Sequence, residues 1–117
     1  MNRITLLGRL TKDPEVQYTP GGKCVARITL AVDRPSKEKK EADFIPVILW
    51  DKQGELVGNS CQKGHRLLVE GRLQIRSYDG KDGQKRWVTE VIANSMEFIE
   101  KKEQKTMAGL GEDVPFE

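Results

Sequence analysis

The sequence has few of the residues that enzymes and metal sites need. Its 117 residues include one histidine, His65, and two cysteines, Cys24 and Cys61, that lack the spacing of a metal-binding pair. No glycine-rich phosphate loop precedes a helical segment, and no Ser-His-Asp arrangement is visible. A Cys61–His65 site at i and i+4 is disfavoured by the glycine that lies between them. We therefore expect no catalysis, no cofactor and no metal.

Long apolar runs are also missing. No stretch approaches the roughly 18 apolar residues of a membrane helix, and the first residues lack the apolar core and cleavage site of a signal peptide. These absences predict a cytoplasmic protein without membrane contact, in which both cysteines are reduced. Cys24 lies in an apolar strand pattern and is expected to be a small buried hydrophobe.

Charged residues are abundant, at 32% of the chain, but the net charge is only +2. The three ionisable side chains of residues 106–117 are all acidic, which leaves +5 for residues 1–105. A mildly basic body attracts polyanions, whereas the acidic end does not. Many proteins share this level of charge, so the asymmetry alone is a weak indication.

Period-two alternation of apolar side chains predicts an all-β fold. Long strands are expected at residues 2–10, 23–33, 43–50, 65–78 and 84–100, with a short extended piece at 15–18. One helix is expected at residues 51–62, capped by Asp51 and weakened by Gly54 and Gly58 by roughly 1 kcal/mol each. A single helix between the third and fourth long strands is typical of a five-stranded OB-fold barrel.

Alternation also predicts which way individual strand residues face. Leu73 and Ile75 are expected to point inward, and Pro46 is expected at an edge or a bulge because it has no N–H group for a sheet ladder. The barrel domain is expected to cover residues 1–100. Residues 101–117 read as a flexible linker and an acidic tip.

The informative surface is the face opposite the predicted core. It presents Phe44 and Trp50 on one strand, and Arg72, Arg76 and Tyr78 on another. Aromatic rings stack on unpaired bases, and arginines neutralise phosphates or stack as well. Burial of the same rings under a loop or in a subunit interface is the alternative, and the pattern alone does not exclude it.

Three further features have two interpretations. Trp87 is either another stacking ring or an interface residue. The loop cations Lys12, Arg34, Lys52 and Lys63 are by default solvated charges, although loops flank the binding groove of an OB barrel. The tip is either a recognition peptide or a frayed end; it comprises Glu112, Asp113, Val114, Pro115 and Phe116.

Residues 8–22, GRLTKDPEVQYTPGG, together with VARITLAV at 25–32, ADF at 42–44, VILW at 47–50 and VEGRL at 69–73, carry a specific resemblance. In order and spacing, residues 2–100 resemble the bacterial-type single-stranded-DNA-binding proteins. The acidic tip with its Pro-Phe pair is similar to the C-terminal tip of that family.

The resemblance implies an OB fold, a homotetramer, and binding of single-stranded DNA without marked sequence preference during replication, recombination and repair. It implies base stacking by Phe44, Trp50 and Tyr78. It implies a DNA path lined by Arg3, Lys52, Lys63 and Arg76, and docking of replication and repair proteins on the tip. An OB-fold accessory subunit that acts mainly in protein docking or RNA binding is the alternative function.

The chain departs from the family pattern in three places. No aromatic residue stands near Arg34-Pro35, where some relatives have a stacking ring. Glu117 follows Phe116, whereas the family tip usually ends on phenylalanine. The segment between barrel and tip is also far shorter than the usual glycine-rich linker. These departures indicate an accessory, phage or mobile-element member.

Overall fold

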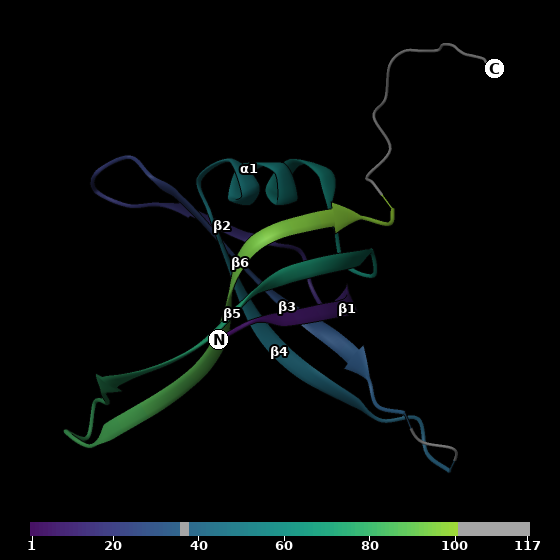
Figure 1. The fold of residues 1–117 in the computed structure, drawn as a ribbon. Helices are drawn as coiled ribbons and strands as arrows, with labels where there is room; N and C mark the ends of the chain where they lie inside the picture. Colours follow the sequence, from purple (N-terminus) through teal and green to yellow (C-terminus); the bar gives the residue numbers. More distant parts are fainter. Residues whose placement is uncertain (36–37, 101–117) are drawn as a thin grey trace.

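The computed structural model describes residues 1–35 and 38–100. In chain order the elements are β1 (Ile4–Leu10), β2 (Glu15–Tyr18), β3 (Cys24–Asp33), β4 (Ala42–Trp50), α1 (Asp51–Ser60), β5 (Arg66–Asp79) and β6 (Lys85–Phe98). Figure 1 shows the strands wrapped around one centre, with α1 lying over one end. The predicted element order is confirmed, and the short extended piece at 15–18 is a strand.

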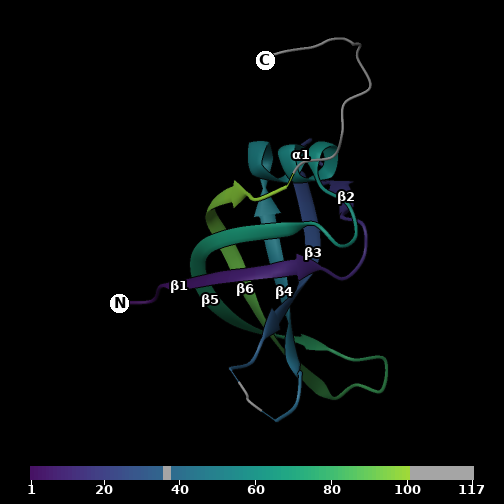
Figure 2. The ribbon, with the colours of Figure 1, turned by 90° about the vertical axis from the view of Figure 1, so that its right-hand side faces the viewer.

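The strands close into a barrel. The sheet order is β1-β5-β6-β4-β3-β2, and β1 also pairs with β3, which joins the two sides. Most neighbours are antiparallel, but β4 and β6 run parallel through Val47↔Val91 and Ile48↔Ile92. Figure 2 shows β1 and β5 crossing the other strands to complete the closure. Five long strands, with β2 added at the edge, form the predicted OB-type barrel.

The core follows from strand alternation, because every second side chain points into the barrel. Its largest fully buried side chains come from all five long strands and from α1: Leu10, Leu30, Leu49, Val47, Val57, Leu67, Val69 and Val91. Cys24 is also buried, as expected.

The helix α1 differs from expectation at its start. Trp50 is the N-cap, no side chain caps the helix, and Asp51 has a φ of +57°. The predicted Asp51 cap is therefore wrong, and the helix ends at Ser60 rather than at residue 62. Gly54 has a packing role: a Cβ there would lie 2.8 Å from the Leu49 carbonyl oxygen. Glycine lowers the stability of the helix, but a larger residue at this position would clash, because α1 packs this close to the strands.

Beyond the barrel, β5 and β6 continue as a two-stranded extension, the β5–β6 arm, defined by residues 73–79 and 85–89 (Figure 1). The arm begins at a bulge next to Gly71, where a Cβ would lie 2.1 Å from the Ile92 carbonyl oxygen. Leu73 and Ile75 belong to the arm and are 38% and 62% exposed. They lie on the inward-directed face, as predicted, but they are not buried, because within residues 1–35 and 38–100 no second layer covers that face once the strands leave the barrel.

Candidate nucleic-acid interface

The pairing registers place one set of side chains on a continuous surface of β3, β4, β6 and β5, directed away from the core. Arg27 pairs with Ile48, Ile48 with Ile92, and Ile92 with Arg72, so one row crosses all four strands. We call this surface the outer face; by alternation it comprises Arg27, Thr29, Phe44, Pro46, Ile48, Trp50, Arg72, Gln74, Arg76, Tyr78, Val88, Glu90 and Ile92.

The three predicted stacking rings are exposed on this face. Phe44 is 67% exposed, Trp50 41% and Tyr78 48%. Burial beneath a loop of the same protomer, one of the two alternatives for these rings, is therefore wrong. Packing against a second protomer is not tested by a single chain. By strand alternation, each ring lies on the side of its strand that is directed away from the core.

Trp87 lies on the other side of the arm. It pairs with Ser77 and shares its face with Leu73 and Ile75, and it is 68% exposed. This placement separates Trp87 from Phe44, Trp50 and Tyr78. The geometry favours the interface interpretation of Trp87 over the stacking one.

Among the predicted strand and N-terminal arginines, Arg3 and Arg76 each meet a carboxylate that sequence reasoning did not single out. Arg3 forms an ion pair with Glu70, and the Arg76 Nε donates to the Glu90 Oε1 at 2.7 Å. Arg72 instead donates to the neutral Gln74 Oε1 at 3.3 Å. The hydrogen bond and charge of Arg3 hold the pKa of Glu70 below its usual value.

Glu90 is the buried polar residue of the barrel, with only 4% of its side chain exposed. Burial alone would raise the pKa of Glu90. Hydrogen bonds from Arg76 and Gln74, and the positive charges of Arg76 and Arg27, outweigh that effect and hold the pKa below its usual value. Glu90 is thus an anion on the outer face, and sequence reasoning missed it.

The loop cations fall into two groups. Lys12 pairs with Glu15 at 3.5 Å, and Arg34 contacts Asp43 at 2.7 Å and lowers the pKa of that carboxyl. Lys52 and Lys63 make no ion pair within residues 1–35 and 38–100. The Lys63 backbone N–H donates to Asp13 at 2.8 Å, which fixes the loop that carries it.

A hollow of about 340 Å³ lies where the barrel meets the arm. Its lining brings Arg3 and Arg72 together from segments far apart in the chain; the lining residues are Asn2, Arg3, Glu70, Gly71, Arg72, Ile92, Ala93 and Asn94. Asn2 fixes the entry of the chain, because its side chain exchanges two hydrogen bonds with the backbone of Leu73.

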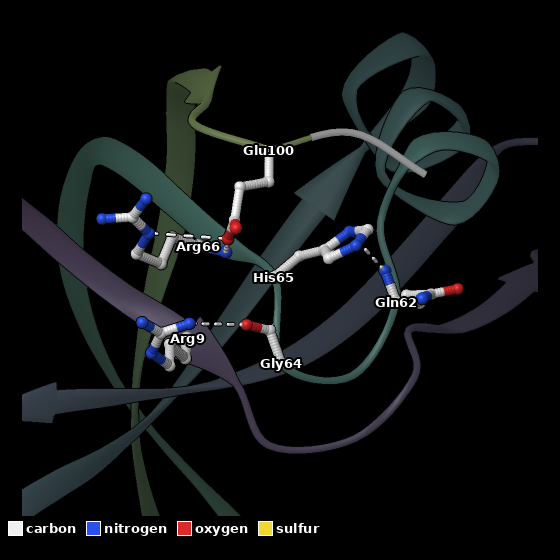
Figure 3. A network of polar contacts seen from close by, with 6 residues as sticks. All are labelled: Arg9, Gln62, Gly64, His65, Arg66 and Glu100. Atoms are coloured by element: carbon white, nitrogen blue, oxygen red, sulfur yellow. Dashed lines mark hydrogen bonds and ion pairs between the residues drawn. The ribbon is translucent and has the colours of Figure 1, made fainter. Parts of the chain in front are cut away.

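The contacts around Cys61 and His65 are hydrogen bonds that hold the loop before β5. The His65 Nδ1 accepts a hydrogen bond from the Gln62 N–H, and the neighbouring Gly64 carbonyl accepts one from Arg9 (Figure 3). Burial raises the pKa of the Cys61 thiol to about 11, so it stays protonated near neutral pH. In the described part of the chain no three His, Cys, Asp or Glu side chains gather as metal ligands.

Comparison with known protein families gives a result that agrees with the barrel topology and the exposed aromatic face. The single-strand binding protein family matches residues 1–99. The chain belongs to this family. Membership confirms the predicted fold class and the predicted activity class, single-stranded DNA binding by a protein that is not an enzyme. Roles in replication, recombination and repair are general for the family.

Relatives agree with this assignment. The chain is 53% identical over 103 residues to "Single-stranded DNA-binding protein 3" of Clostridium acetobutylicum, covering 86% of this chain and 72% of the relative. It is 51% identical over 106 residues to a protein of the same name from Listeria innocua, covering 88% and 66%. It is 47% identical over 116 residues to "Single-stranded DNA-binding protein" of Halalkalibacterium halodurans, covering 97% and 69%.

The remaining predictions concern the end of the chain and the membrane. The tip residues, from Glu112 to Phe116, lie outside the described residues, as does the proposed linker. In the described ranges, no helix has the length and apolar character to cross a membrane.

Proposed function

We propose that single-stranded DNA runs across the outer face, with its bases stacked on Phe44, Trp50 and Tyr78. The observation that carries this proposal is the exposure of all three rings on one face of a family member. Stacking accepts every base, because each base has a π-face, so binding shows little sequence preference.

The cations around these rings supply the attraction to phosphates. Arg72 lies on the outer face itself, and Arg3 adjoins it across the hollow. Arg76 lies on the same face, where its ion pair with Glu90 makes it a contact residue more than a source of net charge. Lys12, Arg34, Lys52 and Lys63 flank the face from loops and from the first turn of α1. Because such contacts release counterions, affinity falls as salt rises.

Tryptophan fluorescence tests the proposal. A Trp87→Phe variant leaves Trp50 as the single tryptophan, and titration with oligo-dT should quench it at low salt and progressively less at high salt. A matched oligo-U titration separates DNA from RNA preference. Unchanged Trp50 emission with full binding by gel shift would move the DNA path away from Trp50, and absence of any binding would contradict the function itself.

A homotetramer is the second part of the proposal. The family resemblance supports it, and so do the large apolar side chains that one protomer leaves exposed on one face of the arm: Leu73 at 38%, Ile75 at 62% and Trp87 at 68%. Monomeric proteins rarely expose a contiguous apolar patch of large size. Light scattering should give four times the protomer mass, and a protomer mass at micromolar concentration would contradict the assembly.

The cellular part of the proposal is a cytoplasmic protein that coats strands during replication, recombination and repair, and recruits partner proteins through Glu112–Phe116. Its support is the similarity of the tip to family tips. Deletion of residues 112–117 should abolish pull-down of partner proteins and leave oligo-dT affinity equal or higher. Pull-down that survives the deletion would show that partners dock elsewhere.

A further inference from the structure

The outer face contains an anion where a polyanion is expected to bind. Glu90 lies between Gln74 and the β4 strand, and its side chain is 4% exposed, whereas Arg76 beside it is 41% exposed. An isolated buried carboxylate would be costly, and removal of its partner typically costs several kcal/mol. Glu90 therefore stays paired with Arg76 unless another cation replaces that arginine.

The pairing uses only one edge of the guanidinium. The Arg76 Nε–H donates to the Glu90 Oε1 at 2.7 Å, and the Gln74 amide donates to the same oxygen at 3.1 Å. An arginine has five N–H donors in a fixed fork, so the Nη groups remain available beyond this bond. Because the guanidinium is planar and rigid, a hydrogen bond that holds Nε also restricts where the Nη groups can point.

We propose that Glu90 is a positioning residue that fixes Arg76 as an oriented hydrogen-bond donor to DNA while cancelling its charge. The inference rests on the proposed DNA path over the outer face. It separates the cations of the site into two kinds. Lys52 and Lys63, without ion pairs among the described residues, attract phosphates at a distance. Arg76 contributes contact and direction, with almost no share in the salt dependence of binding.

The salt dependence of oligo-dT affinity distinguishes the two roles. For single strands the slope of log K against log salt is about −0.7 for each neutralised phosphate. Glu90→Gln keeps an oxygen acceptor for Arg76 but uncovers the arginine charge. The slope should steepen by about 0.7, and the gain in affinity should shrink as salt rises.

Two further variants test positioning. The double variant Arg76→Gln with Glu90→Gln preserves the charge of the pair, and it should lose roughly tenfold in affinity at every salt concentration because a charge-assisted hydrogen bond is lost. Glu90→Asp keeps the negative charge, but its shorter side chain holds the carboxylate closer to the β6 backbone and farther from Arg76. It should keep the wild-type slope and bind more weakly. Glu55→Gln, an exposed charge change on α1, is the control and should leave the slope unchanged.

The outcomes separate this inference from the proposed function. If the wild type binds oligo-dT and Glu90→Gln shows the same slope of log K against log salt as the wild type, Glu90 has only a structural role. If the double variant binds as tightly as wild type, Arg76 lies off the DNA path. Either result overturns the inference. Failure of the wild type to bind oligo-dT would contradict the function instead. Thermal unfolding of each variant shows whether it is folded. If Glu90→Gln does not fold, the affinities and salt slopes of Glu90→Asp and of the double variant test the inference instead.

Discussion

Phe44 and Trp50 point the same way from β4, six residues apart, with Pro46 and Ile48 between them. At about 3.3 Å per residue the two attachment points are roughly 20 Å apart. Pro46 is tolerated there because β6 pairs with β4 only at Val47 and Ile48, so the missing N–H breaks no bond to β6. The two rings are thus too far apart to stack on one base, and we expect them to contact different bases.

This separation predicts additive losses. Phe44→Ala and Trp50→Ala should each weaken oligo-dT binding by about 1–3 kcal/mol, the usual worth of one base on an aromatic ring. The double variant should lose the sum, since distant sites act independently. Leu56→Ala, which removes an exposed apolar side chain from α1, is the control. Gel-shift titration measures all four, and unchanged affinity in either ring variant would place that ring outside the DNA path.

Lys52 and Lys63, which make no ion pair within residues 1–35 and 38–100, predict a change in the salt dependence of binding rather than in base stacking. Lys52→Gln and Lys63→Gln should each make the salt slope of oligo-dT binding shallower by about 0.7, because each removes one phosphate contact. Fluorescence titration at five salt concentrations measures the slope. The charge-preserving double variant of Arg76 and Glu90 serves as the comparison with an unchanged slope. A lysine variant with the wild-type slope would contradict contact between that lysine and phosphate.

Local pattern was sufficient for the barrel core. Ile28, Leu49 and Val69 occupy inward positions of a period-two pattern, and that period is a property of each strand that can be read from the sequence alone. The same reasoning placed Phe44 and Trp50 on the opposite face. It could not decide whether those rings are exposed, since exposure depends on what covers the face; the structure decided that within one protomer.

The alternation pattern failed to predict burial where burial depends on elements that are distant in the sequence. Leu73 and Ile75 continue the alternation of Leu67 and Val69, but beyond Gly71 the strands leave the barrel, and no element of the described residues covers the inward side. Glu90 could not be recognised because its burial depends on the register between β5 and β6 and on the bulge. Composition and spacing contain no measure of either.

The bulge itself predicts a stability effect. Gly71→Ala should lower the free energy of unfolding by about 1–3 kcal/mol, because the added Cβ would lie 2.1 Å from the Ile92 carbonyl oxygen and the backbone must shift. Gly21→Ala is the matched control, since the nearest atom to its Cβ would be 3.9 Å away. Urea unfolding at a fixed protein concentration compares them. Equal stability of the two variants would show that the bulge relaxes without cost.

Replacing Arg76, the ion-pair partner of Glu90, should invert the pH dependence of the contribution that Glu90 makes to the stability of the fold. In the wild type, Arg76 and Gln74 hold the pKa of Glu90 low, so its stabilising effect is complete above the ordinary glutamate pKa of about 4.3 and is lost as pH falls through the lower folded value. In Arg76→Gln, burial is opposed by fewer favourable contacts, and the pKa should rise above the ordinary value. The charged form then destabilises the fold.

The stability deficit of Arg76→Gln relative to wild type should therefore be largest near pH 7 and shrink as pH falls toward the ordinary glutamate pKa, because Glu90 of the variant takes up a proton on the way. Adding Glu90→Gln to that variant should remove most of the deficit at neutral pH, because no buried charge remains. Urea unfolding from pH 4 to pH 7.5, at one protein concentration, measures both effects. A deficit of constant size across this range would show that water or another cation compensates Glu90, and that Arg76 is not its essential partner.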